Sequence, residues 1–195
     1  MNLKLFTPPA VEPVSLADIV SHLRIDSSDE DSLLLSMIEA ARDYCESYQN
    51  RAYITQTWEL ALVSFPSGNE IILPRPPLQS SPTAPTVKYY DTADVEATMA
   101  AADYMVDTYA EPGRIVLKYE KTWPSTTLRP ANGVIIKYVA GYGATAATVP
   151  ERIIQAIKLL VGHMYENRES TDIKELKEIP FAVHSLLGLD RIWPL

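Results

Sequence analysis

The sequence predicts an α+β protein, with a helical core built from both ends of the chain and a mostly antiparallel, β-rich insertion between them. None of the 15 prolines falls within residues 14–65 or 151–179, and nine lie between Pro66 and Pro130. Helices exclude interior proline, whereas turns and strand ends accept it. The apolar residues also change from a helical to an alternating period near Ile54. The expected parts are residues 1–53 (helical), 54–143 (β-rich) and 144–195 (helical with a tail).

Composition limits what such a chain can do. Its 195 residues, 47% of them hydrophobic, suffice for one domain or a small domain with an insertion. No run of about 18 apolar residues predicts a membrane span, and the first residues make a poor secretion signal. The net charge is −8, concentrated in residues 1–50, which hold three basic and nine acidic side chains. Such a protein is poorly suited to grip nucleic acid through phosphates, but it could surround a polyanion without binding it.

The first helix should begin at Ser15, with Asp18 three residues later completing an approximate capping box. The segment "IDSSDED" then ends this helix and begins another, whose first turn is expected to contain Asp29, Glu30 and Asp31. The second helix should run for about five turns. Its expected apolar face consists of Leu33, Met37, Ala40, Ala41, Tyr44 and Tyr48. Cys45, the single cysteine, lies beside this face and is interpreted as a buried structural thiol.

The β-rich part starts with "ITQTWELALVSF", where alternate residues are apolar or aromatic. "PSGN" is typical of a turn, so "EIILP" is expected to return as the second strand of a hairpin. Further strands are expected at "TVKYYD", "VEATM", "DYMVDTY", "GRIVLKY" and "GVIIKYVAGY". Pro74-Arg75-Pro76-Pro77 is interpreted as a corner that turns the chain out of the sheet. A PxxP ligand for an SH3-like module is the alternative.

The last third of the chain returns to helix. Thr148 is expected to cap a helix with Pro150 in its first turn, ending near Asn167. Its apolar stripe consists of Ile153, Ile154, Ile157, Leu160, Val161 and Met164. "STDIKELKE" should be a short polar helix or loop. "PFAVHSLLGLDRIWPL" should form one more short apolar helix, ended by Gly188 and followed by a tail.

The sequence offers little catalytic chemistry. His22, His163 and His184 are scattered, and no CxxC or HExxH motif occurs. Gly141 and Gly143 lie between a strand and a helix without the signature of a phosphate-binding loop, so they favour a β-to-α corner. We therefore expect no catalytic residue, no cofactor and no metal site.

The order of short motifs resembles a known family. "ITQTWEL", "ILPRPPLQS", "VKYYD", "AADYMVD", "PGRIVLK", "WP", "KYVAGYG" and "VPERIIQAIKLLVGHMYENRE" follow in series. Together they are similar to the head–tail connector (adaptor, head-completion) proteins of long-tailed bacteriophages and prophages. The resemblance implies a non-enzymatic ring of about a dozen subunits with head-to-tail contacts. It also implies a place in the virion neck, reached from the host bacterial cytoplasm during assembly. The expected partners are further copies of the chain, the portal and the next neck or tail component. DNA would pass through the lumen without specific binding.

Two groups of residues are candidates for this role. The C-terminal segment is more apolar than a short helix can hide, so it is expected to dock on a neighbouring subunit or the portal, or else to pack on its own core. Its candidate contacts are Phe181, Leu186, Leu187, Ile192 and Trp193. The acidic excess near the N-terminus is expected to face the ring lumen or its mouth, where it would repel DNA. These candidates are Asp26, Asp29, Glu30 and Asp31.

The sequence also leaves two other functions open. The chain could be a different neck or tail-completion component, such as a stopper. It could also be a small-molecule-binding domain or an enzyme with an unrecognised site.

Overall fold

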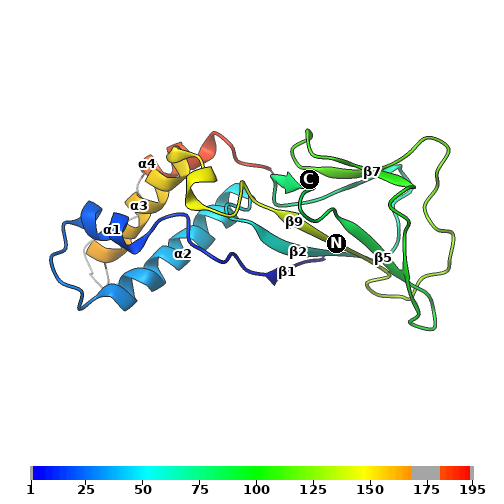
Figure 1. Cartoon of the computed structure of the whole chain (residues 1–195), viewed down its shortest axis with the longest axis horizontal. Helices are drawn as coiled ribbons and strands as arrows, with labels where there is room; N and C mark the ends of the chain where they lie inside the picture. The colour runs from blue at the N-terminus through cyan, green and yellow to red at the C-terminus, as the bar shows by residue number, and fades with distance from the viewer. Residues whose placement is uncertain (1, 168–180, 194–195) are drawn as a thin grey trace. The chain divides into compact units, whose positions relative to one another are not determined.

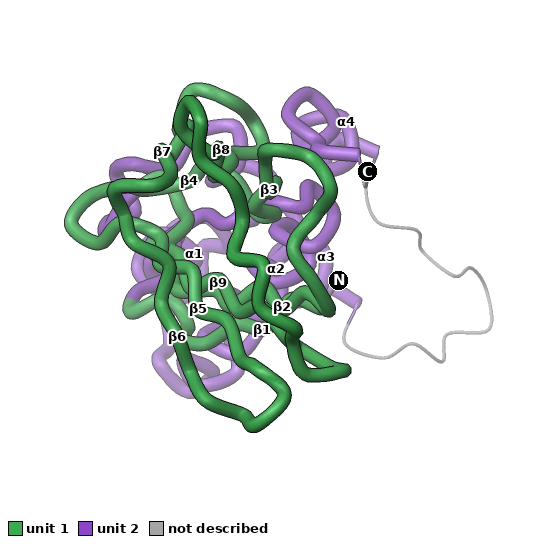
Figure 2. The backbone as a smooth tube through the Cα atoms, turned by 90° about the vertical axis from the view of Figure 1, so that its right-hand side faces the viewer, with its two compact units in different colours: residues 1–10, 55–142 green, residues 11–54, 143–195 purple. Residues whose placement is uncertain are grey.

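The computed structural model describes residues 2–167 and 181–193, which fall into two compact units (Figure 2). The β-unit comprises residues 1–10 and 55–142, and the helical unit comprises residues 11–54 and 143–195. The presence of helices with antiparallel sheets confirms the predicted α+β class. "STDIKELKE" lies outside the described residues. No helix in the described ranges is both long and apolar enough to cross a bilayer.

The helical unit is a small bundle (Figure 1). Its elements are α1 (Leu16–Leu23), α2 (Asp31–Gln49), the 3-10 turn η1 (Ala146–Thr148), α3 (Glu151–Glu166) and α4 (Phe181–Gly188). Helices α1, α2 and α3 pack against one another, and α4 packs against α3 and α2. The core therefore joins helices from both ends of the chain, as the proline-free windows predict. Its fully buried side chains include Ile19, Leu34, Ile38, Ile153 and Ile157.

The capping box of α1 is confirmed. The main-chain N–H of Asp18 donates to Ser15 Oγ at 3.1 Å, and the main-chain N–H of Ser15 donates to Asp18 Oδ2 at 3.3 Å. The helix α2 begins later than expected, because Asp29 closes a local turn with Ser27 and Glu30 is the N-cap. Of the three expected acidic residues, only Asp31 lies in the first turn.

The predicted buried face of α2 is wrong by about one residue. The buried positions are Leu34, Ile38, Ala41, Arg42, Cys45, Glu46 and Gln49. Of the expected residues, Ala41 is buried as predicted, whereas Ala40 is exposed. The other four are half-buried: Leu33, Met37, Tyr44 and Tyr48. The prediction failed because three of the buried side chains are polar or charged, so they do not register as part of an apolar face. The expected stripe of α3 is buried, apart from half-buried Met164.

Thr148 does not cap α3, which is a second correction. Its hydroxyl donates to the main-chain carbonyl of Thr145 within η1, and Pro150 occupies the N-cap position. The end of α3 is as expected, with Asn167 as its C-cap.

The β-unit contains two antiparallel sheets. The larger has the order β1-β2-β9-β5-β6, with β4 also paired to β9, and the smaller has the order β3-β8-β7. The strands are β1 (Asn2–Thr7), β2 (Gln56–Leu62), β3 (Glu70–Ile72), β4 (Leu78–Gln79), β5 (Thr86–Tyr90), β6 (Glu96–Thr98), β7 (Tyr104–Asp107), β8 (Arg114–Leu117) and β9 (Val134–Ala140). Both sheets bury apolar side chains, among them Leu60, Val87 and Ile136 from the larger and Ile71 and Ile115 from the smaller.

The predicted hairpin between "ITQTWELALVSF" and "EIILP" does not form. Strand β2 has β1 on one edge and β9 on the other, so neither edge is open to β3. Strand β3 pairs with β8 instead, in the smaller sheet. The strands β1 and β4 were not expected from the sequence.

The corner at Pro74–Pro77 is confirmed. This segment carries the chain from β3 in the smaller sheet to β4 in the larger one. The carbonyl of Pro74 accepts from the Tyr138 hydroxyl at 2.7 Å, and that of Pro77 accepts from the main-chain N–H of Gly141 at 2.9 Å. Arg75 has φ 62°, in the left-handed region. A PxxP ligand requires a polyproline II backbone with negative φ, so this segment does not have that conformation.

Candidate functional site

The C-terminal segment is fastened to the end of α2. Gln49 Nε2 donates to the main-chain carbonyl of Leu187 at 2.7 Å, and Asn50 Nδ2 donates to that of Ile192 at 2.8 Å. Arg51 Nε donates to the carbonyl of Asp190 at 2.7 Å. The main-chain N–H of Ile192 in turn donates to the carbonyl of Gln49 at 2.9 Å. Three consecutive residues at the end of α2 thus hold the tail mainly through its backbone.

Arg191 lies between two aromatic rings. Its guanidinium carbon is 4.4 Å from the ring centroid of Tyr48 and 4.5 Å from that of Trp193. The Tyr48 ring also contacts the His184 ring edge-on, with centroids 4.9 Å apart. Asp190 forms an ion pair with Arg152 of α3. The tail is therefore ordered by a stack of rings around a cation as well as by hydrogen bonds.

The predicted contact residues of this segment differ in accessibility. Leu187 is fully buried together with Val183, so this part of α4 packs on its own unit. Leu186 and Ile192 are half-buried. The exposed large side chains are Phe181 at 85%, Leu189 at 76% and Trp193 at 70%. We call Phe181, Leu189 and Trp193 the α4 patch. Leu189 and Arg191 were not singled out from the sequence, although both lie within the apolar tail that was.

The four acidic candidates near α2 lie in two environments. Asp26 and Asp29 are exposed, and Asp29 exchanges hydrogen bonds with Ser27. Glu30 and Asp31 are half-buried, and Glu30 Oε2 accepts from the hydroxyl of Tyr165 on α3 at 2.6 Å. Glu30 therefore has a structural contact within the unit, whereas Asp26 and Asp29 present their carboxylates to solvent.

A buried ionic cluster supports the helical unit. Arg42 Nε lies 2.8 Å from Glu12 Oε2, and Arg42 Nη1 lies 3.1 Å from Glu46 Oε2. Burial alone would lower the pKa of Arg42, but the carboxylates of Glu12 and Glu46 raise it. Glu46 Oε1 also accepts from the main-chain N–H of Tyr53 at 2.6 Å. These charged groups are hydrogen-bonded to one another and to the main chain, so their burial is explained by a structural role.

Cys45 is a buried structural thiol, as interpreted from the sequence. It is fully buried, and desolvation raises its pKa to about 12, with a smaller effect from nearby Glu46. A thiol of this kind is almost entirely protonated at neutral pH, which makes it a poor nucleophile. Within the described ranges, no three His, Cys, Asp or Glu side chains come together as a possible metal site.

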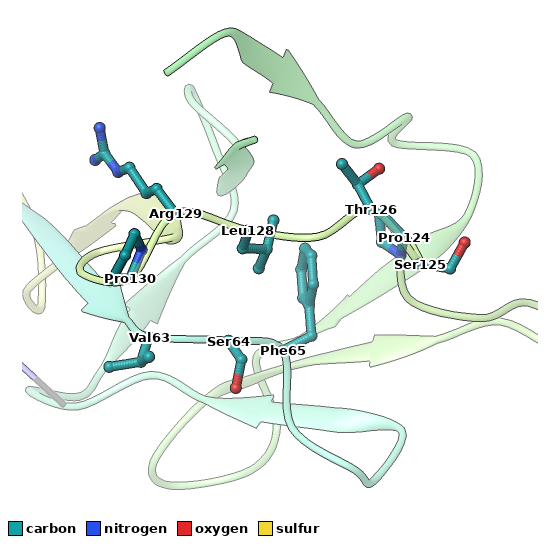
Figure 3. Close-up of a pocket in the computed structure, with 9 residues that line it drawn as sticks. All are labelled: Val63, Ser64, Phe65, Pro124, Ser125, Thr126, Leu128, Arg129 and Pro130. Carbon is teal, nitrogen blue, oxygen red and sulfur yellow. The ribbon is translucent and has the colours of Figure 1, made fainter. Parts of the chain in front are cut away.

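The β-unit has an open hollow of about 370 Å³ beside the loop before β9 (Figure 3). The ring of Phe65 rises toward the segment that carries Leu128, with Arg129 and Pro130 on one side and Pro124 and Thr126 on the other. Arg129 donates twice to the carbonyl of Asn132 and lies 4.0 Å over the Tyr90 ring. The lining holds Ser64, Ser125 and Thr126 but no carboxylate or imidazole. It therefore lacks the base that would activate a hydroxyl nucleophile.

Within the described ranges, the helical unit presents exposed apolar and acidic side chains, and the lining of the hollow in the β-unit holds no carboxylate or imidazole. Exposed large apolar side chains are typical of the class of proteins that bind other proteins.

Comparison with known proteins specifies the class. The head completion protein family matches residues 13–175, and the chain belongs to this family. No curated protein matched the chain.

Solved structures of phage-like particles are consistent with membership of this family. The chain is similar to a component of the neck of an empty gene transfer agent particle computed with C6 symmetry, with 25% identity and a TM-score of 0.81. It is also similar to a component of the native gene transfer agent virion, with 25% identity and a TM-score of 0.80. For the neck of the native particle computed with C12 symmetry, the identity is 26% and the TM-score is 0.75. In each case the match covers 100% of this chain and 97% of the other.

Proposed function

We propose that this protein is a structural head–tail connector that closes into a ring below the portal and joins the capsid to the rest of the neck. The main support is that the whole chain is similar in structure to neck components of particles reconstructed with C6 and C12 symmetry. Copies related by cyclic symmetry use the same contact repeatedly, which requires two different faces on each subunit. The partners of the ring are its own copies, the portal above and a stopper-like or tail component below.

The role we propose is non-enzymatic. The family is one of head completion proteins, which points to a step in particle assembly. The lining of the hollow in the β-unit also lacks a nucleophile–base pair. Assembly takes place in the cytoplasm of the bacterial host, and the finished ring belongs to the neck of the particle.

The charge distribution supports a lumen that lets DNA slide. Between them, the two units carry the net charge of −8 unequally. The helical unit has 16 acidic and nine basic residues, whereas the β-unit has nine and eight. We place exposed Asp26 and Asp29 at the lumen or its mouth, where they repel phosphates instead of releasing counterions to bind them. Glu30 and Asp31 add charge beside them, although Glu30 is engaged with Tyr165.

A component of another level of the neck is the second candidate, because the similar structures are of the neck as a whole. A stopper-like protein would bind only after an adaptor ring is in place, whereas an adaptor binds the portal directly. The order of addition therefore separates the two functions.

The test uses DNA-filled heads made without this protein. Purified full-length protein should bind these heads at the portal vertex and make them competent to accept tails. Binding that requires prior addition of another neck protein would replace the adaptor assignment with the stopper-like one. Heads that accept tails equally well without the protein would overturn both.

A further inference from the structure

We propose that the α4 patch of one copy docks on the outward face of α2 in the next copy. We define this α2 face by Leu35, Glu39, Ala40 and Asp43. The inference rests on the proposed ring, and it names the two surfaces that repeat around it.

The α4 patch has no cover within the described chain. Helix α4 buries Val183 and Leu187 against its own unit. Its first residue, Phe181, is exposed, and so are Leu189 and Trp193 in the tail that follows the helix. These three side chains are 70–85% exposed. Large apolar side chains left exposed in this way are typical of a site of protein association. Aromatic residues in particular are enriched at the centres of interfaces.

Arg191 gives the α4 patch a cation. The guanidinium contacts the rings of Tyr48 and Trp193, and it has no carboxylate partner among residues 2–167 and 181–193. The neighbouring charges, Arg152 and Asp190, neutralise each other in an ion pair. A half-buried guanidinium beside an exposed apolar surface is suited to a partner that brings a carboxylate.

The outward face of α2 offers that combination. Leu35 is 50% exposed, and Glu39, Ala40 and Asp43 are exposed on the same side of the helix. Within the described residues, Glu39 has one ion-pair partner, Arg42 at 4.0 Å, and Asp43 has none. Ala40 leaves room for a bulky ring to approach the helix. The α2 face therefore has two carboxylates and an exposed leucine. These groups complement the cation and the three large apolar side chains at the α4 patch.

The two surfaces are different parts of one subunit, as a closed ring requires. When the α4 patch of one copy binds the α2 face of the next, the first copy still has a free α2 face and the second still has a free α4 patch. The contact can then repeat until the ring closes.

Variants with one added cysteine test the contact across the subunit boundary. Ala40→Cys and Ala182→Cys each replace a small, exposed side chain, and native Cys45 is buried with a raised pKa. Rings assembled from a mixture of the two variants should give disulfide-linked dimers under mild oxidation. Either variant alone should give none. Ala182→Cys mixed with Ala101→Cys, which lies in an exposed turn of the β-unit, is the matched control.

The outcomes distinguish the contact from the ring itself. Rings that form normally but give no more dimer from the mixture than from the control overturn the contact and leave the proposed function standing. Failure of the unmodified protein to form rings, alone or on the portal, overturns both the contact and the proposed function.

A charge exchange tests the contact in a second way. Asp43→Arg should reduce ring formation about tenfold, and adding Arg191→Glu should restore it. If the single and double variants are both folded but the double variant does not regain ring formation, the Arg191–Asp43 pairing is contradicted.

Discussion

The side-chain amide of Gln49 donates a 2.7 Å hydrogen bond to the main-chain carbonyl of Leu187, which fastens α4 to the end of α2. The same amide accepts from the hydroxyl of Tyr53 at 2.7 Å through its oxygen. Gln49 and Tyr53 are both fully buried. One side chain therefore satisfies two buried polar groups that lie far apart in the sequence.

Gln49→Leu should destabilise the protein by about 1–3 kcal/mol, because it leaves both the Tyr53 hydroxyl and the Leu187 carbonyl without their partner. Chemical denaturation measures the change, and Ser47→Ala on the exposed side of α2 is the control, expected to change stability by less than about 0.5 kcal/mol. Equal stability of the Gln49→Leu variant and the control would show that the fastening is not energetically important.

Arg42→Met should cost more, about 3–5 kcal/mol, because Glu46 and Glu12 would lose their cation in a buried setting. Glu39→Gln is the comparison, since Glu39 is exposed and lies 4.0 Å from the same guanidinium. Thermal unfolding of the two variants should differ clearly. Similar melting temperatures would mean that the cluster is hydrated in solution.

The capping box of α1 predicts a pH dependence. The hydrogen bond from Ser15 is the main cause that holds the pKa of Asp18 below its usual value of 3.8. A lowered folded-state pKa means that the stabilisation is present above pH 3.8 and is lost as pH falls through the folded value. Ser15→Ala should therefore cost about 1 kcal/mol at pH 7 and less near pH 2.5. Calorimetry at both values checks this against Ser21→Ala. A gap that widens at low pH would refute the assignment.

Cys45 should resist alkylation and disulfide exchange at pH 8 in the folded protein, since burial raises its pKa to about 12 and excludes the reagent. In denaturant the thiol should react within the time typical of a free cysteine. Fast reaction without denaturant would indicate that the core opens readily around α2.

Exposed Asp26 and Asp29 should keep DNA from binding. Replacing both with lysine should leave the fold intact and give rings that bind duplex DNA in low salt, with affinity that falls as salt rises. Asp94→Lys with Glu120→Lys, in the β-unit, makes the same change in charge elsewhere and should give weaker binding. Filter binding across a salt series makes the comparison. Tight DNA binding by the unmodified ring at physiological salt would contradict a repelling lumen.

Local signals in the sequence predicted much of the fold. Ser15 with Asp18 marked the start of α1, and the prolines at positions 74–77 marked the corner between the sheets. These features depend on nearby residues, so a short stretch is sufficient to identify them. The order of the short motifs also indicated the family.

Features that depend on distant residues were not predictable in this way. Burial of Arg42, Glu46 and Gln49 requires partners from Glu12, Tyr53 and Leu187, so apolar periodicity placed the face of α2 one residue off. Strand β3 pairs with β8 across more than 40 residues, because β1 and β9 occupy both edges of β2. For the C-terminal segment, the sequence indicated an apolar surface. Only the structure separated buried Leu187 from exposed Phe181 and Trp193.

We propose that copies of this chain form the ring that connects the portal to the neck. A cryo-EM reconstruction of the complete particle, focused on the head–tail junction, would show whether this ring is present. We predict a closed ring with this fold directly below the portal, with the α4 patch of each subunit against α2 of the next. Density for this chain at another position in the particle, or a junction completed without it, would contradict the account.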